Sequence, residues 1–169
     1  IAVANGEGFI KITGEVGTGK TLLCRKFLAT LDTAWTSAYI PNPDLEPRAL
    51  VQQIAEELGV RVEPGVDQHH LLKGITRVLL DNARQGRRVV LCMDESQGMP
   101  LETLETVRLL TNLETEKRKL LQVVLFGQPE LDRKLASESI RQLRQRITFQ
   151  YGLRGLDRNA LFLREGAHG

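Results

Sequence analysis

The stretch GEVGTGKT, residues 14–21, constrains the fold of this chain more than any other part of its sequence. It fits the pattern G-x-x-x-x-G-K-[ST], in which a glycine-rich loop is followed by a lysine and a hydroxyl residue. Glycine allows positive φ angles and close approach to a ligand, so that successive N–H groups can surround an anion. The run GFIKIT before the loop reads as a buried strand, and Leu23, Phe27 and Leu31 recur behind it at helical spacing. A strand, a glycine-rich loop and a helix in this order predict a phosphate-binding loop.

The ligand expected at this loop is a nucleoside triphosphate. We expect Lys20 to reach the β- and γ-phosphates and the hydroxyl of Thr21 to bind Mg²⁺. A glycine turn that merely caps the following helix is the alternative interpretation. The predicted nucleotide-binding residues are Gly14, Glu15, Val16, Gly17, Thr18, Gly19, Lys20, Thr21 and Leu22.

A pair of acids follows the apolar run VVLCM, which is typical of a strand buried on both faces of a parallel sheet. Ligands of open α/β sheets bind at the carboxyl ends of the strands, where Asp94 and Glu95 would lie. Asp94 suits the Walker B role of holding Mg²⁺, directly or through water. Glu95 is a candidate for polarising the attacking water, which favours ATP hydrolysis. The alternative interpretation is that the two acids simply begin a surface loop.

Gln128 follows the next buried run, KLLQVVLFG, and is a candidate sensor of the γ-phosphate. A plain strand-to-helix turn, with Pro129 at the first helical position, would also explain the local sequence.

The segment IRQLRQRI, residues 140–147, contains Arg141, Arg144 and Arg146. Arg141 and Arg144 are three residues apart and could share the solvated face of a helix. The alternative is that Arg146, or else Arg144, is an arginine finger that reaches the ATP of a neighbouring subunit.

Strand and helix patterns alternate along the chain, which indicates an α/β fold with a parallel sheet flanked by helices. We expect Asp44 to cap the second helix, and Gly59 and Gly86 to end the second and third. Strands are expected at residues 8–13, 36–40, 87–95, 119–127 and 148–153, and helices at 20–31, 45–58, 67–86, 101–114 and within 129–147.

Composition narrows the possible function only slightly. A length of 169 residues suggests one domain, and a net charge of +2 neither demands nor excludes a nucleic-acid partner. Two cysteines are too few for a disulfide framework in a chain of this size and favour a reducing compartment. No apolar run approaches the roughly 20 residues of a membrane-spanning helix.

These motifs together resemble the core of an AAA+ ATPase, the additional-strand class of P-loop NTPases. The segments GFIKITGEVGTGKTLLCRKFL, VVLCMDESQ, RLLTNLETEKRKLLQVVLFGQPEL and IRQLRQRITFQYGLR are more specific. They resemble the ExeA/GspA-type ATPases of bacterial general secretion, and most of all those of the MshM type, which serve MSHA pilus biogenesis. In this class the strand before Gln128 lies between the phosphate-loop strand and the Walker B strand.

The resemblance implies a Mg²⁺-dependent ATPase that supports assembly of a type IV pilus or a secretion apparatus. It also implies a homo-oligomer, ATP and ADP as ligands, pilus or secretion proteins as partners, and a place on the cytoplasmic face of the inner membrane. Membrane association would come only through parts outside this sequence. The roles carry over to Lys20, Thr21, Asp94, Glu95, Gln128 and Arg146, the residues that match the motifs.

The chain departs from the family pattern near its C-terminal end. Gly155 stands where a proline usually follows YGLR, and LDRNALFLREGAHG does not develop into the helical lid. We therefore expect an AAA+ core at residues 1–158, a truncated C-terminal segment at 159–169, and a missing or incomplete lid domain.

Two other functions remain open from the sequence. An AAA+ ATPase of DNA transposition or replication initiation would share this core, although the nearly balanced charge does not favour nucleic acid. A slow nucleotide-gated scaffold would bind ATP and use the γ-phosphate mainly to order loops.

Overall fold

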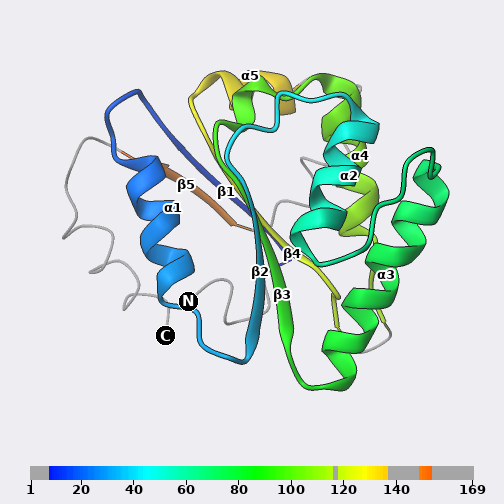
Figure 1. Ribbon diagram of the computed structural model, residues 1–169. Helices are drawn as coiled ribbons and strands as arrows, with labels where there is room; N and C mark the ends of the chain where they lie inside the picture. The colour runs from blue at the N-terminus through cyan, green and yellow to red at the C-terminus, as the bar shows by residue number, and fades with distance from the viewer. Residues whose placement is uncertain (1–7, 116–117, 137–148, 154–169) are drawn as a thin grey trace.

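A five-stranded parallel sheet forms the centre of the molecule (Figure 1). The computed structural model describes residues 8–115, 118–136 and 149–153. The strands lie in the order β2-β3-β4-β1-β5, and every neighbouring pair is parallel. Their bounds are Phe9–Gly14 for β1, Trp35–Ile40 for β2, Arg88–Met93 for β3, Gln122–Gly127 for β4 and Phe149–Leu153 for β5. The predicted α/β fold is confirmed, including the position of β4 between β1 and β3.

Helices cover both faces of the sheet because parallel neighbours need crossover connections (Figure 1). Helix α1 lies on one face, while α2, α3 and α4 lie on the other. The helices span Lys20–Ala29 for α1, Pro47–Glu57 for α2, Gln68–Arg84 for α3, Leu101–Thr111 for α4 and Glu130–Leu135 for α5, and a 3₁₀ turn, η1, spans Ser96–Gly98. Within the described ranges, no helix combines the length and the apolar character that crossing a bilayer requires.

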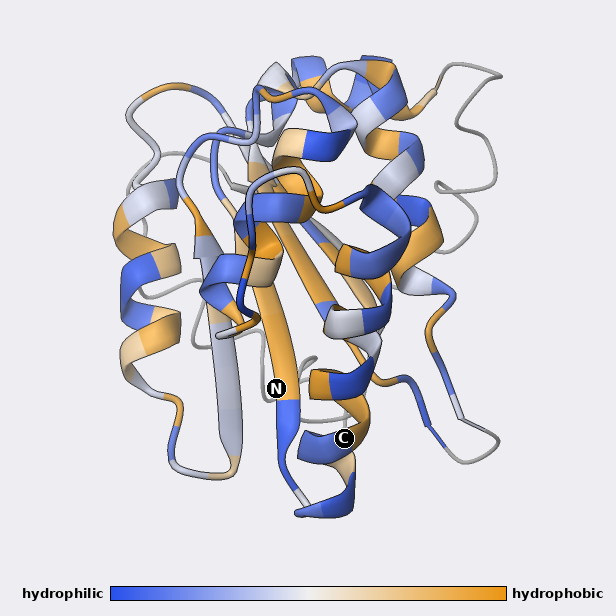
Figure 2. Ribbon diagram, turned by 45° about the vertical axis from the view of Figure 1, so that its right-hand side comes forward, coloured by the Kyte–Doolittle hydropathy of each residue, from blue (hydrophilic) through white to orange (hydrophobic). Residues whose placement is uncertain are grey.

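Two apolar clusters fill the space between the sheet and the helices, and the central strands supply both. In β3, Leu91 faces the cluster under α2, α3 and α4, whereas Val90 and Cys92 face the cluster under α1. In β4, Val123 and Val124 divide in the same way. Successive side chains of a strand point to opposite faces, so a strand covered on both sides is apolar throughout. Figure 2 shows central strands that are orange over most of their length, whereas the helices alternate between blue and orange segments.

The glycine ends of α2 and α3 are confirmed, but the predicted cap of α2 is wrong. Gly59 and Gly86 have φ of 79° and 72°, a conformation that suits a residue without Cβ. Asp44 does not cap α2, because Pro47 begins the helix and Glu46 takes the N-cap position. Proline fits the first helical turn, since its φ is already helical and it has no N–H to satisfy. At α3 the cap is Asp67, whose side chain accepts a hydrogen bond from the backbone N–H of His70 at 2.8 Å.

Candidate nucleotide site

Three neighbouring strands lead into the predicted site residues at their carboxyl ends. These are the glycine-rich loop, the acid pair and Gln128. Strand β1 ends at Gly14, β3 at Met93 and β4 at Gly127. Because β4 lies between β3 and β1 and all three are parallel, the three loops leave the same edge of the sheet. Ligands of open α/β sheets bind at this edge.

The backbone of the glycine-rich loop has the conformation that an anion-binding loop requires. Gly17 and Gly19 have φ of 83° and 84°, in the left-handed region that residues with a Cβ seldom adopt. Gly19 precedes α1, where no side chain caps the helix and no acid occupies the first turn. The positive end of the helix dipole is therefore available to a negatively charged group.

The side chain of Lys20 is buried inside the loop rather than extended into solvent. Its Nζ donates hydrogen bonds to the carbonyl oxygens of Gly14 at 2.7 Å and of Glu15 at 2.9 Å. Lys20 is 6% exposed, so few waters can share its charge. An ammonium that is held among backbone carbonyls at the start of a helix is placed to exchange some of them for phosphate oxygens.

Thr21 and Asp94 connect the glycine-rich loop to the end of β3. The Thr21 hydroxyl donates to Oδ2 of Asp94 at 2.7 Å, and the backbone N–H of Glu95 donates to Oδ1 at 2.9 Å. Asp94 is 2% exposed, and its own N–H donates to the Ile40 carbonyl oxygen on β2. A hydroxyl and a carboxylate oxygen in contact form the kind of oxygen donor set that Mg²⁺ accepts. The residues present therefore fit a magnesium ion.

Glu95 is the one described non-glycine residue with a positive φ, 50°, combined with a ψ of 39°. A residue with a Cβ held in this region costs on the order of 1 kcal/mol or more, and such residues concentrate at functional sites. The side chain is half-buried, and its Oε2 accepts a hydrogen bond from Nε2 of Gln97 at 2.6 Å. The backbone strain is thus associated with a carboxylate in a defined position.

Gln128 is half-buried directly after β4, at the same edge of the sheet. Its backbone N–H donates to Oε1 of Gln97 at 3.0 Å. Pro129 is the N-cap residue of α5 rather than its first helical residue. Gln97 was not among the site residues predicted from the sequence, because its local signal is no more than a polar residue two positions after Glu95.

Two pKa shifts occur close to the acid pair. The pKa of Tyr39 on β2 is raised, first by burial and then by the negative charge of Asp94, which opposes ionisation of the phenol. The pKa of Cys92 is raised strongly by its hydrogen bond with Cys24 and by burial. The Cys92 thiol is therefore neutral at physiological pH.

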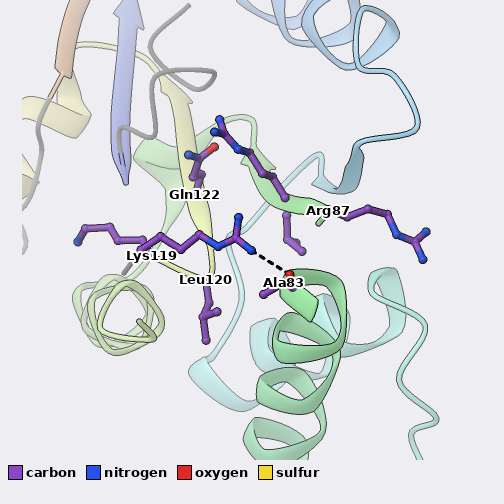
Figure 3. Close-up of a pocket in the computed structure, with 8 residues that line it drawn as sticks. Ala83, Arg87, Lys119, Leu120 and Gln122 are labelled. Carbon is purple, nitrogen blue, oxygen red and sulfur yellow. Dashed lines mark hydrogen bonds between the residues drawn. The ribbon is translucent and has the colours of Figure 1, made fainter. Parts of the chain in front are cut away.

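A hollow at the opposite end of the sheet is a poor candidate for the nucleotide site (Figure 3). Its volume of ≈ 70 Å³ is well below the roughly 300 Å³ at which ligand pockets begin. Arg118 donates to the Ala83 carbonyl at 2.9 Å, and Figure 3 shows Arg87 and Lys119 extending away from each other. Ala83 lies in the last turn of α3, where positive charge offsets the helix dipole. Arg118 therefore supports the end of α3.

The two candidate finger residues, Arg146 and Arg144, lie outside the described residues, as does Arg141. The C-terminal segment 154–169, with the predicted lid boundary, also lies outside them. The structure therefore brings together the loop, the acid pair and Gln128, and the finger stays a prediction.

Comparisons with known proteins agree with this geometry. The AAA domain family matches residues 3–135. General secretion pathway protein A of Aeromonas hydrophila is 46% identical over 149 residues, which cover 88% of this chain and 27% of that protein. The chain thus spans about a quarter of the length of this curated relative.

Solved structures share the fold at low sequence identity. The ORC2 protein of Aeropyrum pernix, in its ADPNP–ADP complexes, matches with a TM-score of 0.68 and 18% identity, over 90% of this chain and 44% of that one. Cdc6p of Pyrobaculum aerophilum matches with a TM-score of 0.66 and 20% identity, over 86% of this chain and 38% of that one.

Proposed function

Since this chain belongs to the AAA domain family, we propose that it binds ATP with Mg²⁺ at the edge of the sheet formed by β1, β3 and β4, and hydrolyses it to ADP and phosphate there. The observation that carries the proposal is the Thr21–Asp94 hydrogen bond beside Glu95. It joins a phosphate-binding loop to an acid pair, and both parts are needed for metal-assisted phosphoryl transfer.

Each residue has a role that follows from its chemistry. Lys20 would neutralise charge on the β- and γ-phosphates, with the N–H groups of the loop around them. Thr21 and Asp94 would hold Mg²⁺, which when bound stabilises negative charge on the phosphate oxygens. Glu95 would orient a water molecule and accept its proton. The side chain of Gln128, at the tip of β4, would contact the γ-phosphate.

We further propose that the ATPase supports assembly of a secretion apparatus. The support is the 46% identity to general secretion pathway protein A over 88% of this chain. Because that relative is much longer, partners and localisation rest on the resemblance. A role in a type IV pilus of the MSHA kind and a place on the cytoplasmic side of the inner membrane are the finer forms of the proposal.

Oligomerisation is part of the same proposal. A homo-oligomer would let Arg146 or Arg144 of one subunit approach the ATP of the next, where a guanidinium stabilises the transition state. The AAA+ core would comprise residues 1–158, followed by the segment 159–169.

The two other functions gain less support. Identities of 18–20% to ORC2 and Cdc6p show a shared fold and carry no DNA-binding function to this chain. A DNA partner would make affinity fall steeply with salt, which a binding titration at several salt concentrations would reveal. A slow scaffold would bind ATP with a turnover that hardly depends on Glu95.

The test of the proposed function compares the chain with its Glu95→Gln variant. We expect ATP affinity to change by less than about threefold, while turnover falls by at least about a hundredfold, the usual contribution of a positioned base. Glu102→Gln, on the exposed first turn of α4, is the matched control and should behave like the parent chain. Equal turnover in Glu95→Gln would contradict the role of Glu95, and no detectable ATP binding by the parent chain would contradict the function itself.

A further inference from the structure

The side-chain amide of Gln97 joins the Glu95 carboxylate to the tip of β4. Its Nε2 donates to Oε2 of Glu95 at 2.6 Å, and its Oε1 accepts from the backbone N–H of Gln128 at 3.0 Å. The second bond spans 31 positions of the chain. One side chain thus connects the candidate base to the strand end that carries the candidate sensor.

The chemistry of the partners determines which way this amide points. An ionised carboxylate can only accept hydrogen bonds, and a backbone N–H can only donate one. Glutamine alone among the ordinary side chains of this length offers a donor and an acceptor side by side. Exchanging the positions of Nε2 and Oε1 in Gln97 would break both hydrogen bonds at once. The two partners therefore determine which end of the amide carries the nitrogen.

Contacts with the ends of β3 and β4 and with α5 hold the segment that carries Gln97. The Ser96 hydroxyl donates to the Met93 carbonyl at 2.9 Å, and Lys134 of α5 donates to the Met99 carbonyl at 2.8 Å. On the side of β4, a Cβ added to Gly127 would lie 3.3 Å from both the backbone N and Oε1 of Gln97. The absence of a side chain at Gly127 therefore lets Gln97 approach the strand end closely.

We propose that Gln97 is a positioning residue for hydrolysis, which holds Glu95 by one carboxylate oxygen and aligns it with the tip of β4. This inference rests on the proposed function and deepens it. With Oε2 bound to Gln97, Oε1 of Glu95 keeps both of its lone pairs for a water molecule. A displacement of about 1 Å in such a group can cost on the order of a hundredfold in rate, so the position of the carboxylate matters. Any movement of the β4 tip would reach Glu95 through this amide.

The kinetic test uses two substitutions at Gln97. Gln97→Met keeps the length of the side chain but loses both hydrogen bonds, and Gln97→Glu keeps an acceptor for Gln128 while losing the donor to Glu95. For both we expect kcat to fall about 10- to 100-fold with KM within about twofold, because the Glu95 bond is broken in each. Gln52→Met is the matched control, since it breaks a Gln–Glu bond of 3.2 Å on the exposed surface of α2. An unchanged or increased kcat, or a KM that rises with loss of ATP binding, would overturn the proposal.

A second measurement does not depend on turnover. In ¹H–¹⁵N spectra, Glu95→Ala should shift the backbone amide resonance of Gln128 in the parent chain but not in the Gln97→Met background. No shift in either background would overturn the connection through Gln97. If the parent chain bound ATP without hydrolysing it, the proposed function would fail, and these spectra would still decide whether Gln97 holds Glu95. Thermal unfolding identifies a variant that does not fold, in which case Gln97→Glu replaces Gln97→Met.

Discussion

The hydroxyl of Thr21 donates a hydrogen bond of 2.7 Å to Oδ2 of Asp94, although 73 positions separate the two residues in the chain. Thr21 belongs to the first turn of α1, and Asp94 follows β3 directly. The glycine-rich loop connects β1 to α1, so Thr21 lies at the same edge of the sheet as Asp94. The hydrogen bond shows that the glycine-rich loop and the acid pair are in direct contact there. It is also the contact that makes a shared magnesium site possible.

The Thr21–Asp94 pair predicts a specific dependence on Mg²⁺. Thr21→Ala removes the hydroxyl, and we expect it to weaken Mg²⁺-supported ATP affinity by at least about tenfold, or 1.4 kcal/mol. Thr21→Ser keeps the hydroxyl and should stay within about threefold of the parent chain. Titration of a fluorescent ATP analogue with and without Mg²⁺ measures both. Equal losses in the two variants would show that the hydroxyl is not the group that matters.

Lys20 should be necessary for nucleotide binding. Lys20→Ala removes a buried ammonium and its charge-assisted hydrogen bonds, each worth about 1.5–3 kcal/mol. We expect ATP affinity to fall at least about tenfold and turnover to become undetectable. Lys26→Ala, in the last turn of the same helix, is the control for loss of one positive charge. Isothermal calorimetry would decide, and unchanged ATP affinity in Lys20→Ala would reject the assignment.

Because Glu95 has a positive φ, we expect the residue at this position to lower the stability of the fold. Glu95→Gly and Glu95→Ala both lose the carboxylate, but only glycine adopts a φ of 50° without strain. We expect the glycine variant to be more stable than the alanine variant by about 1 kcal/mol, with hydrolysis lost in both. Urea unfolding followed by circular dichroism measures the difference. A more stable alanine variant would mean that the loop relaxes when the carboxylate is removed.

We expect the folded protein to lose stability in acid when Asp67 becomes protonated. Its pKa is lowered by the hydrogen bond from the backbone N–H of His70 and then by the one from the His70 side chain. The folded state therefore favours the carboxylate, so this stabilisation is complete above the unfolded pKa, near 4, and is lost as pH falls through the folded pKa. Asp67→Asn should keep the cap without titrating.

Thermal unfolding of the parent chain and of the Asp67→Asn variant at several pH values measures this contribution of Asp67. The melting temperature of the parent chain should exceed that of Asp67→Asn at neutral pH, and the gap should close below about pH 4. A gap that stays constant down to pH 2 would show that the charge of Asp67 does not contribute.

The two cysteines should be inert in the native protein. Cys24 and Cys92 are both 0% exposed, and the raised pKa of Cys92 keeps its thiol neutral. Since the thiolate is the reactive form, we expect a thiol reagent to modify neither residue in native buffer within minutes. Two equivalents should react after unfolding in guanidinium. Modification of the native protein at the rate of a free thiol would contradict the packing of α1 against β3.

Much of the fold was predictable because its signals are local. The apolar runs before Gly14, Asp94 and Gln128 have the length and composition of strands buried on both faces, and the structure confirms all three strands. The cap of α2 was predicted wrongly at Asp44, since Pro47 determined the helix start more strongly than a capping side chain. The strand predicted at residues 87–95 is shorter in the structure, because β3 ends at Met93 and the acid pair follows it outside the sheet.

By itself, the sequence determined the α/β class, the glycine-rich loop between a strand and a helix, and the acid pair after a buried strand, because glycine spacing and hydrophobic periodicity are properties of neighbouring residues. The tertiary structure decided the rest. The order β3-β4-β1 places Thr21 beside Asp94, and the contact of Gln97 with the end of β4 connects Glu95 to Gln128. Hydrogen bonds between residues 31 or 73 positions apart depend on how the strands are ordered, which the family resemblance predicted but no local pattern in the sequence carries.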